Sequence, residues 1–162
     1  MRYLIAVIML FCANATAHAT DDADKVAAIS ATLDKFHTAA STADWGTYFG
    51  LMSEDAIFLG TDAGERWDIP TFKSYAEPTK GWTYVMQERH INLTPDGHSA
   101  WFDELLNNEK YGTSRGTGIL IRTNDGWKIS QYHLTFPIPN DLAAGITQQI
   151  QVFEQQQKMG QN

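Results

Sequence analysis

The last third of the chain alternates between apolar and polar residues and is divided by glycine-containing turns. Residues 117–141 read TGILIRTNDGWKISQYHLTFPIPND, and the turn Asn124-Asp125-Gly126 separates two strand-like runs. Such a turn suits a type I geometry followed by a left-handed glycine. This segment therefore predicts a β-hairpin, and it requires an antiparallel sheet with one buried and one open face.

The alternating pattern begins directly after Gly81 and continues almost to the end of the sheet region. Short turn-like segments, of which Pro95-Asp96-Gly97 is the clearest, separate its runs. Because an apolar residue at every second position is typical of a half-buried strand, we expect four successive strands. They cover residues 83–94, 98–107, 113–123 and 127–136.

The first part of the chain has a helical period instead. Apolar residues recur at spacings of three and four between residues 23 and 43, which predicts an amphipathic helix. Asp44 and Asp68 are predicted to cap two shorter helices, the second with Pro70 in its first turn. Residues 54–60 between them predict a short strand. Helices followed by an antiparallel meander indicate an α+β fold with helices packed across one face of a curved sheet.

The N-terminus has the pattern of a secretory signal peptide. Arg2 precedes an apolar run over residues 4–11, and Ala17-His18-Ala19 is a small-x-small cleavage site. The apolar run is too short for a membrane span, which needs about 20 residues. We therefore expect cleavage after residue 19 and a periplasmic or secreted protein. Cleavage would remove Cys12, leaving neither a disulfide nor thiolate chemistry.

The remaining chain is long enough for one domain with its own core. We assign residues 20–144 to this domain and residues 145–162 to a C-terminal helix and glutamine-rich tail. The formal net charge of the whole chain is −7, and removal of Arg2 makes it more negative. Nucleic acids and anionic membranes both attract Lys and Arg, so the sequence predicts neither as a partner.

The turn at residues 124–126 also predicts which side chains share a face. A three-residue loop pairs Thr123 with Trp127 and Ile121 with Ile129, and it continues to Ile119 with Gln131 and Thr117 with His133. This face has the denser apolar set, so we assign it, together with Arg115, to the pocket. The opposite face would carry Leu120, Tyr132 and Leu134 outward, and it predicts a homodimer through the outer sheet surface.

The turn at residues 95–97 allows two registers for the preceding hairpin. A three-residue loop opposes Arg89 to Asp103, on one face with Ile91 and Trp101. A two-residue loop would oppose His90 to Asp103 and Arg89 to Glu104. Either register places Asp103 opposite a basic residue.

Two residues are candidates for acid–base chemistry. Asp103 and His133 form the best general acid–base pair if both face an apolar pocket. The alternative is an interior ion pair and a hydrogen-bonded core histidine. Candidate ligand-binding residues are Arg89, Trp101, Arg115, Trp67, Tyr48 and Gln131.

Arg115 could bind a ligand carboxylate through its bidentate guanidinium. Its alternative is a salt bridge to Glu104 or Glu109 at the mouth of the pocket. Trp67 ends the loop of residues 60–67, which could line that mouth with Asp62 or Glu65 as a polar group.

Cofactor and metal sites are not predicted. His37, His90, His98 and His133 lack the spacings of metal-binding motifs, and there is no glycine-rich phosphate loop. We therefore expect neither a metal nor a cofactor.

Four segments together resemble a SnoaL-like domain of the nuclear transport factor 2-like superfamily, over residues 29–144. They are residues 58–62 (FLGTD), 101–104 (WFDE), 115–118 (RGTG) and 126–141, which begins GWKI. The resemblance implies a long helix over a strongly bent sheet, a conical pocket between them, and dimers through the outer sheet face. Ketosteroid isomerase and the polyketide cyclases resemble the chain in fold, but their catalytic residues have no counterpart motif here.

Three functions are consistent with these patterns. The first is the binding of a small, partly apolar molecule in the pocket. The second is a cofactor-independent isomerase or cyclase that uses Asp103 and His133. The third is a dimerisation or protein-interaction module.

Overall fold

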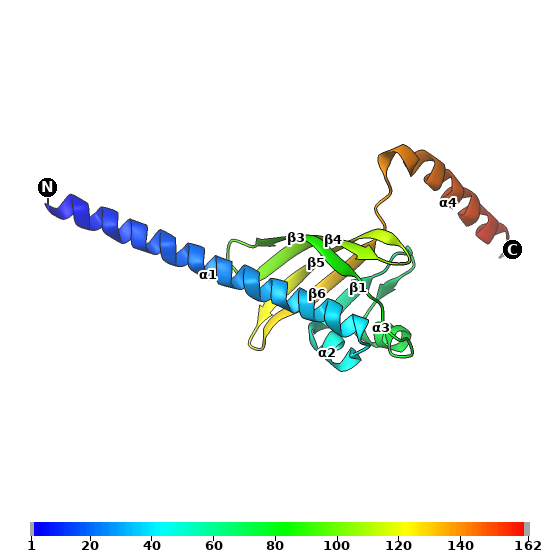
Figure 1. Ribbon diagram of the computed structural model, residues 1–162, viewed down its shortest axis with the longest axis horizontal. Coiled ribbons are helices and arrows are strands. Elements are labelled where there is room, and N and C mark those ends of the chain that lie inside the picture. Colours follow the sequence, from blue (N-terminus) through cyan, green and yellow to red (C-terminus); the bar gives the residue numbers. More distant parts are fainter. Residues whose placement is uncertain (1, 161–162) are drawn as a thin grey trace.

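The computed structural model describes the backbone of residues 2–160 and the side chains of residues 20–160, and it shows one long helix lying across a curved sheet (Figure 1). The predicted signal peptide, residues 1–19, lies outside the residues whose side chains are described, so its cleavage stays a prediction. Among the described residues, no helix combines the length and apolarity that crossing a membrane requires.

Helix α1 (Arg2–Ser41) presents the predicted apolar stripe to the sheet. Ile29, Leu33, Phe36 and Ala40 are all buried, which confirms the helical spacing read from the sequence. Phe36 stacks on Tyr48 of helix α2 (Trp45–Gly50) with ring centroids 4.1 Å apart. The stripe therefore joins the two helices to the hydrophobic core.

The two predicted caps are confirmed. The Asp44 carboxylate accepts a hydrogen bond from the Thr47 N–H at 3.0 Å at the start of α2. The Asp68 carboxylate accepts from the Thr71 N–H at 2.9 Å at the start of helix α3 (Ile69–Ala76). Each cap satisfies a backbone donor that the first helical turn leaves without a partner.

The sheet has six strands in the order β2-β1-β6-β5-β4-β3. They are β1 (Met52–Leu59), β2 (Arg66–Trp67), β3 (Val85–Leu93), β4 (Ser99–Asn108), β5 (Gly112–Thr123) and β6 (Gly126–Thr135). The predicted meander β3–β6 is antiparallel throughout. Strand β1 pairs in parallel with β6, so the sheet is mixed and not purely antiparallel as expected.

The β5–β6 hairpin differs from the predicted register near its turn. Thr123 lies opposite Gly126, so the loop contains two residues and not three. An irregularity between Ile119 and Leu120 then restores the predicted pairing of Ile119 with Gln131. A β-bulge adds one residue to one strand, and it therefore compensates for the shorter loop.

The buried face is the opposite of the predicted one along β5 and in the second half of β6. Leu120 and Tyr132 are buried with 0% and 3% of their surface exposed, whereas Ile119 is 41% exposed. The predicted pairs Thr123–Trp127 and Ile121–Ile129 do not form. The face assigned to a dimer interface thus packs against the helices, and most of the face assigned to the pocket lies outside, but Trp127 and Ile129 are buried as predicted.

The β3–β4 hairpin adopts the second of the two registers considered. Arg89 lies opposite Glu104, and His90 lies opposite Asp103. The alternative pairing of Arg89 with Asp103 does not form, and Asp103 lies opposite a basic residue, as either register predicted. Phe102 and Glu104 consequently point toward α1, and Trp101 and Asp103 point away from it.

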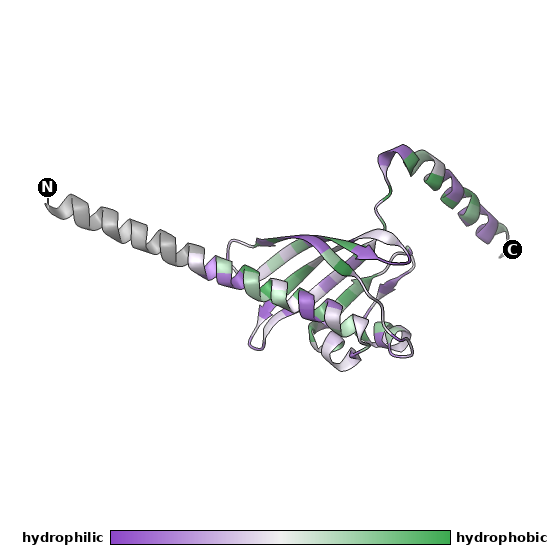
Figure 2. Cartoon of the chain, in the orientation of Figure 1, coloured by the Kyte–Doolittle hydropathy of each residue, from purple (hydrophilic) through white to green (hydrophobic). Residues whose placement is uncertain are grey.

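Helix α4 (Asn140–Gly160) follows the sheet and has no buried residue. It stands away from the sheet in Figure 1, and Figure 2 shows apolar and polar residues alternating along it. Leu142, Ile150 and Phe153, three large apolar residues of this helix, are 56%, 45% and 59% exposed. The predicted C-terminal helix therefore forms but adds nothing to the core.

Candidate ligand-binding cleft

An open cleft of about 200 Å³ lies at one end of the sheet. Eight of the twelve described residues that line it are aromatic, and Glu65 is the charged residue among them. The lining consists of Phe58, Gly60, Thr61, Glu65, Trp67, Phe72, Tyr75, Trp82, Tyr84, Tyr111, Leu134 and Phe136. An apolar hollow with a few polar groups is the usual form of a small-molecule site.

Segments far apart in the sequence supply this lining. The β1–β2 loop and α3 form one wall, and the β4–β5 turn and the end of β6 contribute the opposite side. The segment before β3 adds Trp82, whose N–H donates to the Ala40 carbonyl at 3.1 Å. Gly81 has a φ of +86°, and a Cβ there would collide with the same carbonyl. Glycine at this position therefore lets Trp82 lie close to the end of α1.

The residues that line the cleft are buried at its base and exposed at its rim. Phe58 and Phe72 are buried at its base and stack with ring centroids 4.0 Å apart. Tyr75 and Tyr111 are about half exposed at its rim. Trp67 contacts the rim ring of Tyr75 with centroids 4.7 Å apart. A ligand entering the cleft would therefore meet ring edges and faces from outside to inside.

Three tyrosines lie near one another in this lining. Burial raises the pKa of Tyr84, and the nearby Tyr111 and Tyr75 hydroxyl groups raise it further. Tyrosine hydroxyl groups can donate as well as accept hydrogen bonds. They add polarity to a cleft whose surface is otherwise largely apolar.

Glu65 is fixed within the β1–β2 loop. Its Oε2 accepts a hydrogen bond from the Asp62 N–H at 3.2 Å. The Gly60 N–H donates to the Glu65 carbonyl at 2.9 Å, which closes the loop. A Cβ on Gly60 would overlap the Glu65 carboxylate. The loop therefore folds the acidic side chain back over Gly60, where it lines the cleft.

A smaller cavity of about 10 Å³ shares four lining residues with the cleft and lies deeper. The shared residues are Phe58, Trp82, Tyr84 and Leu134. Its inner lining adds Phe36, His37, Tyr48 and Tyr132. This volume is at the lower limit for one water molecule. Its wall therefore contains residues of the aromatic cleft together with His37 and Tyr132, two of the polar side chains of the interior.

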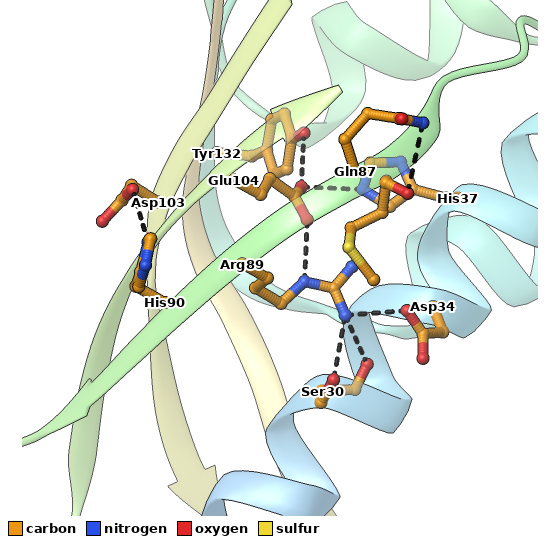
Figure 3. Close-up of polar contacts among 10 residues, drawn as sticks. Ser30, Asp34, His37, Gln87, Arg89, His90, Asp103, Glu104 and Tyr132 are labelled. Atoms are coloured by element: carbon orange, nitrogen blue, oxygen red, sulfur yellow. Dashed lines mark hydrogen bonds and ion pairs between the residues drawn. The ribbon is translucent and has the colours of Figure 1, made fainter. Parts of the chain in front are cut away.

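Glu104 is the centre of those polar groups (Figure 3). Its Oε1 lies 2.7 Å from His37 Nε2 and accepts a hydrogen bond from the Tyr132 hydroxyl at 3.0 Å. Its Oε2 accepts from Arg89 Nε at 2.8 Å. Burial by itself would raise the pKa of Glu104, but His37 and Arg89 together hold that pKa below its ordinary value. The carboxylate is therefore ionised, and His37 Nε2 must be the donor.

Arg89 links this network to helix α1. Its Nη1 donates to Ser30 Oγ at 3.0 Å and to the Asp34 carboxylate at 2.7 Å (Figure 3). Its Nη2 is buried and has no hydrogen-bond partner among the described residues. Tyr132 is also part of the network, and burial followed by the charge of Glu104 raises its pKa well above the ordinary value. The network fixes the helix over β3 and β4.

The proposed catalytic residues lie outside the cleft. Asp103, Thr117 and His133 occupy one row across β4, β5 and β6. Asp103 and His133 do share a face, as predicted, but it is the outer face. One intervening strand separates them by about 10 Å, since neighbouring strands are 4.7–4.9 Å apart. This separation is too large for direct proton transfer between them.

The predicted ligand-binding residues divide between the two faces. Trp101, Arg115 and Gln131 belong to the outer face, so their assignment to the pocket was wrong. Arg89 points inward, but its guanidinium is bound within the network. Trp67 lines the cleft and Tyr48 lines the smaller cavity. A role in ligand binding stays a prediction for both.

His37 is the inward-facing polar residue that the sequence reasoning missed. It lies next to the apolar stripe of α1, in a row with Ser30 and Asp34 at spacings of four and three. That spacing places the three side chains on one face of a helix. A polar row beside a buried stripe was thus the available indication of the network.

No group of three or more His, Cys, Asp or Glu side chains among the described residues is arranged to hold a metal ion. The donor that remains unpaired in the network, Arg89 Nη2, is a cation and would repel one.

The fold is an α+β cone of the nuclear transport factor 2-like type. Residues 29–139 match the SnoaL-like domain family, and the chain belongs to this family. A search of curated proteins found no match.

Solved structures support the same fold. A protein of unknown function from Pectobacterium atrosepticum is 17% identical, with a TM-score of 0.62 over 72% of this chain and 93% of that chain. A proposed dehydratase of the nuclear transport factor 2-like family from Streptomyces avermitilis is 16% identical, with a TM-score of 0.57 over 72% and 98%. A proposed ketosteroid isomerase from Shewanella frigidimarina is 19% identical, with a TM-score of 0.54 over 66% and 94%. At these identities the similarity concerns the fold alone.

Proposed function

We propose that this domain binds a small, largely apolar molecule in the aromatic cleft. The observation that carries this proposal is the lining itself, in which eight of twelve described residues are aromatic. Aromatic side chains with solvent-exposed rims are typical of recognition surfaces, because they offer large contact areas with few rotatable bonds. Glu65, Thr61 and the tyrosine hydroxyls supply the few polar groups that orient a ligand.

The size of the cleft limits the ligand. A volume of about 200 Å³ corresponds to roughly seven water-sized groups at about 30 Å³ each. This is below the roughly 300–1,000 Å³ of sites for drug-sized molecules. The ligand is therefore a molecule of about that many non-hydrogen atoms, or one end of a longer molecule that extends into solvent.

Native mass spectrometry of the protein purified from its own host tests this proposal. We expect a mass above that of the denatured chain, and loss of the difference in Tyr75→Ala and Tyr111→Ala variants. Both residues are exposed rim residues, so their removal should leave the fold intact. Trp101→Ala removes an aromatic ring from the outer face and serves as the control. An adduct that persists in both rim variants, or disappears equally in the control, would contradict the proposal.

A second candidate function is acid–base catalysis through His37. The observation in its favour is the short contact of His37 Nε2 with the buried carboxylate of Glu104, beside the cavity that extends the cleft. A carboxylate that holds one ring nitrogen leaves the other nitrogen available as a base. This arrangement replaces the predicted pair of Asp103 and His133.

Conversion of the ligand identified by mass spectrometry tests the second candidate. His37→Gln should abolish turnover while the ligand still binds, and His133→Gln should leave turnover unchanged. Equal turnover in wild type and His37→Gln would exclude the role of His37.

We also propose a homodimer through the outer sheet face. Trp101 and Ile119 lie opposite each other on β4 and β5, are 49% and 41% exposed, and so form a contiguous apolar patch of the kind that marks protein interfaces. Light scattering should give twice the chain mass, and Ile119→Lys should give the monomer mass. A monomeric wild type at high concentration would contradict the dimer.

Export is the remaining proposal and rests on the sequence alone. The intact mass of the protein from a periplasmic or culture fraction should correspond to a chain that begins near Thr20. Recovery of the full-length chain from the cytoplasm would contradict export.

A further inference from the structure

We infer that the ligand of the aromatic cleft is a small organic cation of the alkylammonium class. This inference rests on the proposed function, since it specifies the chemistry of the molecule that the same cleft binds. It follows from three properties of the lining: its charge, its rings and the way in which its carboxylate is fixed.

The charge of the lining favours a cation. Among the described residues that line the cleft there is one carboxylate, Glu65, and neither Lys nor Arg. Glu65 Oε1 accepts no hydrogen bond from the described residues, whereas Oε2 is held by the Asp62 N–H. A ligand anion would lose its hydration beside an uncompensated negative charge, and a ligand cation would neutralise that charge. The formal net charge of −7 also raises the local concentration of cations.

The rings favour an alkylated ammonium over a metal ion. Aromatic faces attract cations through the negative face of the ring, and this attraction is strongest for cations that give up their water readily. Trp67, Tyr75 and Trp82 are tilted by about 37–38° in successive pairs and are not stacked in parallel. The chain already shows such a contact at the rim, where the Lys110 ammonium lies 4.7 Å from the Tyr111 ring centroid.

The carboxylate is held at the cleft by the loop geometry. A Cβ on Gly60 would overlap Glu65 Oε2, so this position must lack a side chain for Glu65 to fold back. Gly60 has no positive φ, and alanine is therefore tolerated by the backbone itself. A Gly60→Ala substitution should displace the Glu65 side chain without removing it.

The size of the cleft agrees with this class of ligand. Choline contains a trimethylammonium group, a two-carbon tail and a hydroxyl, which matches the roughly seven water-sized groups that the cleft holds. Its neutral isostere carries a tert-butyl group in place of the trimethylammonium and has the same shape. The pair therefore separates the effect of charge from that of apolar contact.

Titration of the purified domain with choline and with this isostere tests the inference. Trp67 and Trp82 line the cleft, so the fluorescence of tryptophan should report binding of either probe. We expect choline to bind at least about tenfold more tightly than the isostere. Glu65→Gln should weaken choline binding several-fold and leave the affinity for the isostere nearly unchanged. Gly60→Ala should weaken choline binding more than isostere binding, although its methyl group also enters the lining of the cleft. Glu77→Gln removes the same charge from the exposed end of α3 and should change neither affinity.

The outcomes distinguish this inference from the proposed function. Equal affinities for the two probes, or a choline affinity that is insensitive to Glu65→Gln, would overturn the cationic class and leave an apolar binding cleft. Failure of choline to bind would also overturn it, even where a neutral molecule is found by mass spectrometry. Failure of both probes, together with the absence of any bound mass, would remove the proposed function as well.

Discussion

Two neighbouring charged pairs on β3 and β4 have opposite environments. Arg89 and Glu104 face α1, and their side chains are 4% and 0% exposed. His90 follows Arg89 on β3, and Asp103 precedes Glu104 on β4. These two side chains face outward and are 59% and 50% exposed. The atoms in contact are 2.8 Å apart in the inner pair and 3.3 Å apart in the outer pair.

The comparison shows that the strand register determines which of two similar ion pairs is buried and which is exposed. Both pairs join a basic residue of β3 to an acid of β4, and a slip of one residue would instead place Arg89 opposite Asp103 and leave Glu104 without its basic partner. The inner pair is surrounded by further partners and links a helix to the sheet. The outer pair is in contact with water, which screens it and leaves little net stabilisation.

Removal of the inner carboxylate should give the largest effect. Glu104→Ala leaves the buried Arg89 guanidinium and the Tyr132 hydroxyl without their partner, and breaking a buried pair in this way costs about 3–5 kcal/mol. Urea denaturation followed by circular dichroism measures the loss. Asp103→Ala is the matched control and should cost less than about 1 kcal/mol. Similar losses in both variants would contradict the difference between the faces.

Gly116 provides a second test on the adjacent strand. A Cβ there would collide with the Tyr132 hydroxyl and crowd Glu104 Oε1, so Gly116→Ala should cost about 1–3 kcal/mol. Thr117→Ala changes the next residue, whose side chain is on the outer face, and should cost less. The same denaturation measurement applies. An unchanged free energy of unfolding in Gly116→Ala would show that the network tolerates displacement.

Acid should affect the inner pair through protonation. The folded-state pKa of Glu104 is lowered from its ordinary value of 4.5, so its stabilising contribution is present above that value and is lost as the pH falls through the folded-state pKa. The free energy of unfolding of the wild type should therefore decrease more steeply below pH 4.5 than that of Glu104→Gln. Other carboxylates contribute equally to both proteins. If the free energies of unfolding of the two proteins decrease in parallel as the pH falls, protonation of Glu104 is not what destabilises the fold.

The outer pair should give the smallest effect. A double-mutant cycle of His90→Ala and Asp103→Asn should yield a coupling free energy below about 1 kcal/mol, because both groups are exposed and screened. Salt should reduce that coupling further. A coupling as large as that between Arg89 and Glu104 would mean that the outer face is covered in solution, as in the proposed dimer.

The regular elements could be predicted because local patterns determine them. Ile29, Leu33 and Phe36 recur with a helical period, and Asp44 and Asp68 have the position and chemistry of caps. The meander was predicted for a similar reason, since its strands alternate and its turns contain glycine. The parallel pairing of β1 with β6 has no local pattern and was not predicted.

The faces of the strands could not be predicted from the turns alone. The denser apolar set pointed to Ile119 as a core residue, but Ile119 is exposed and its neighbour Leu120 is buried. A two-residue loop and the irregularity between these residues then decided the outcome. The cleft was also hidden, because Tyr75, Trp82 and Phe136 converge only in the folded chain.

The parallel contact of β1 with β6 has a consequence for the order of folding. Met52 pairs with Ile129 and Leu59 with His133, so β1 finds its long partner only when the last strand is present. Its other neighbour, β2, has two residues and cannot substitute. Such non-local pairing closes a large loop and is intrinsically slow. We therefore expect the meander β3–β6 to assemble before β1 and the helices pack onto it.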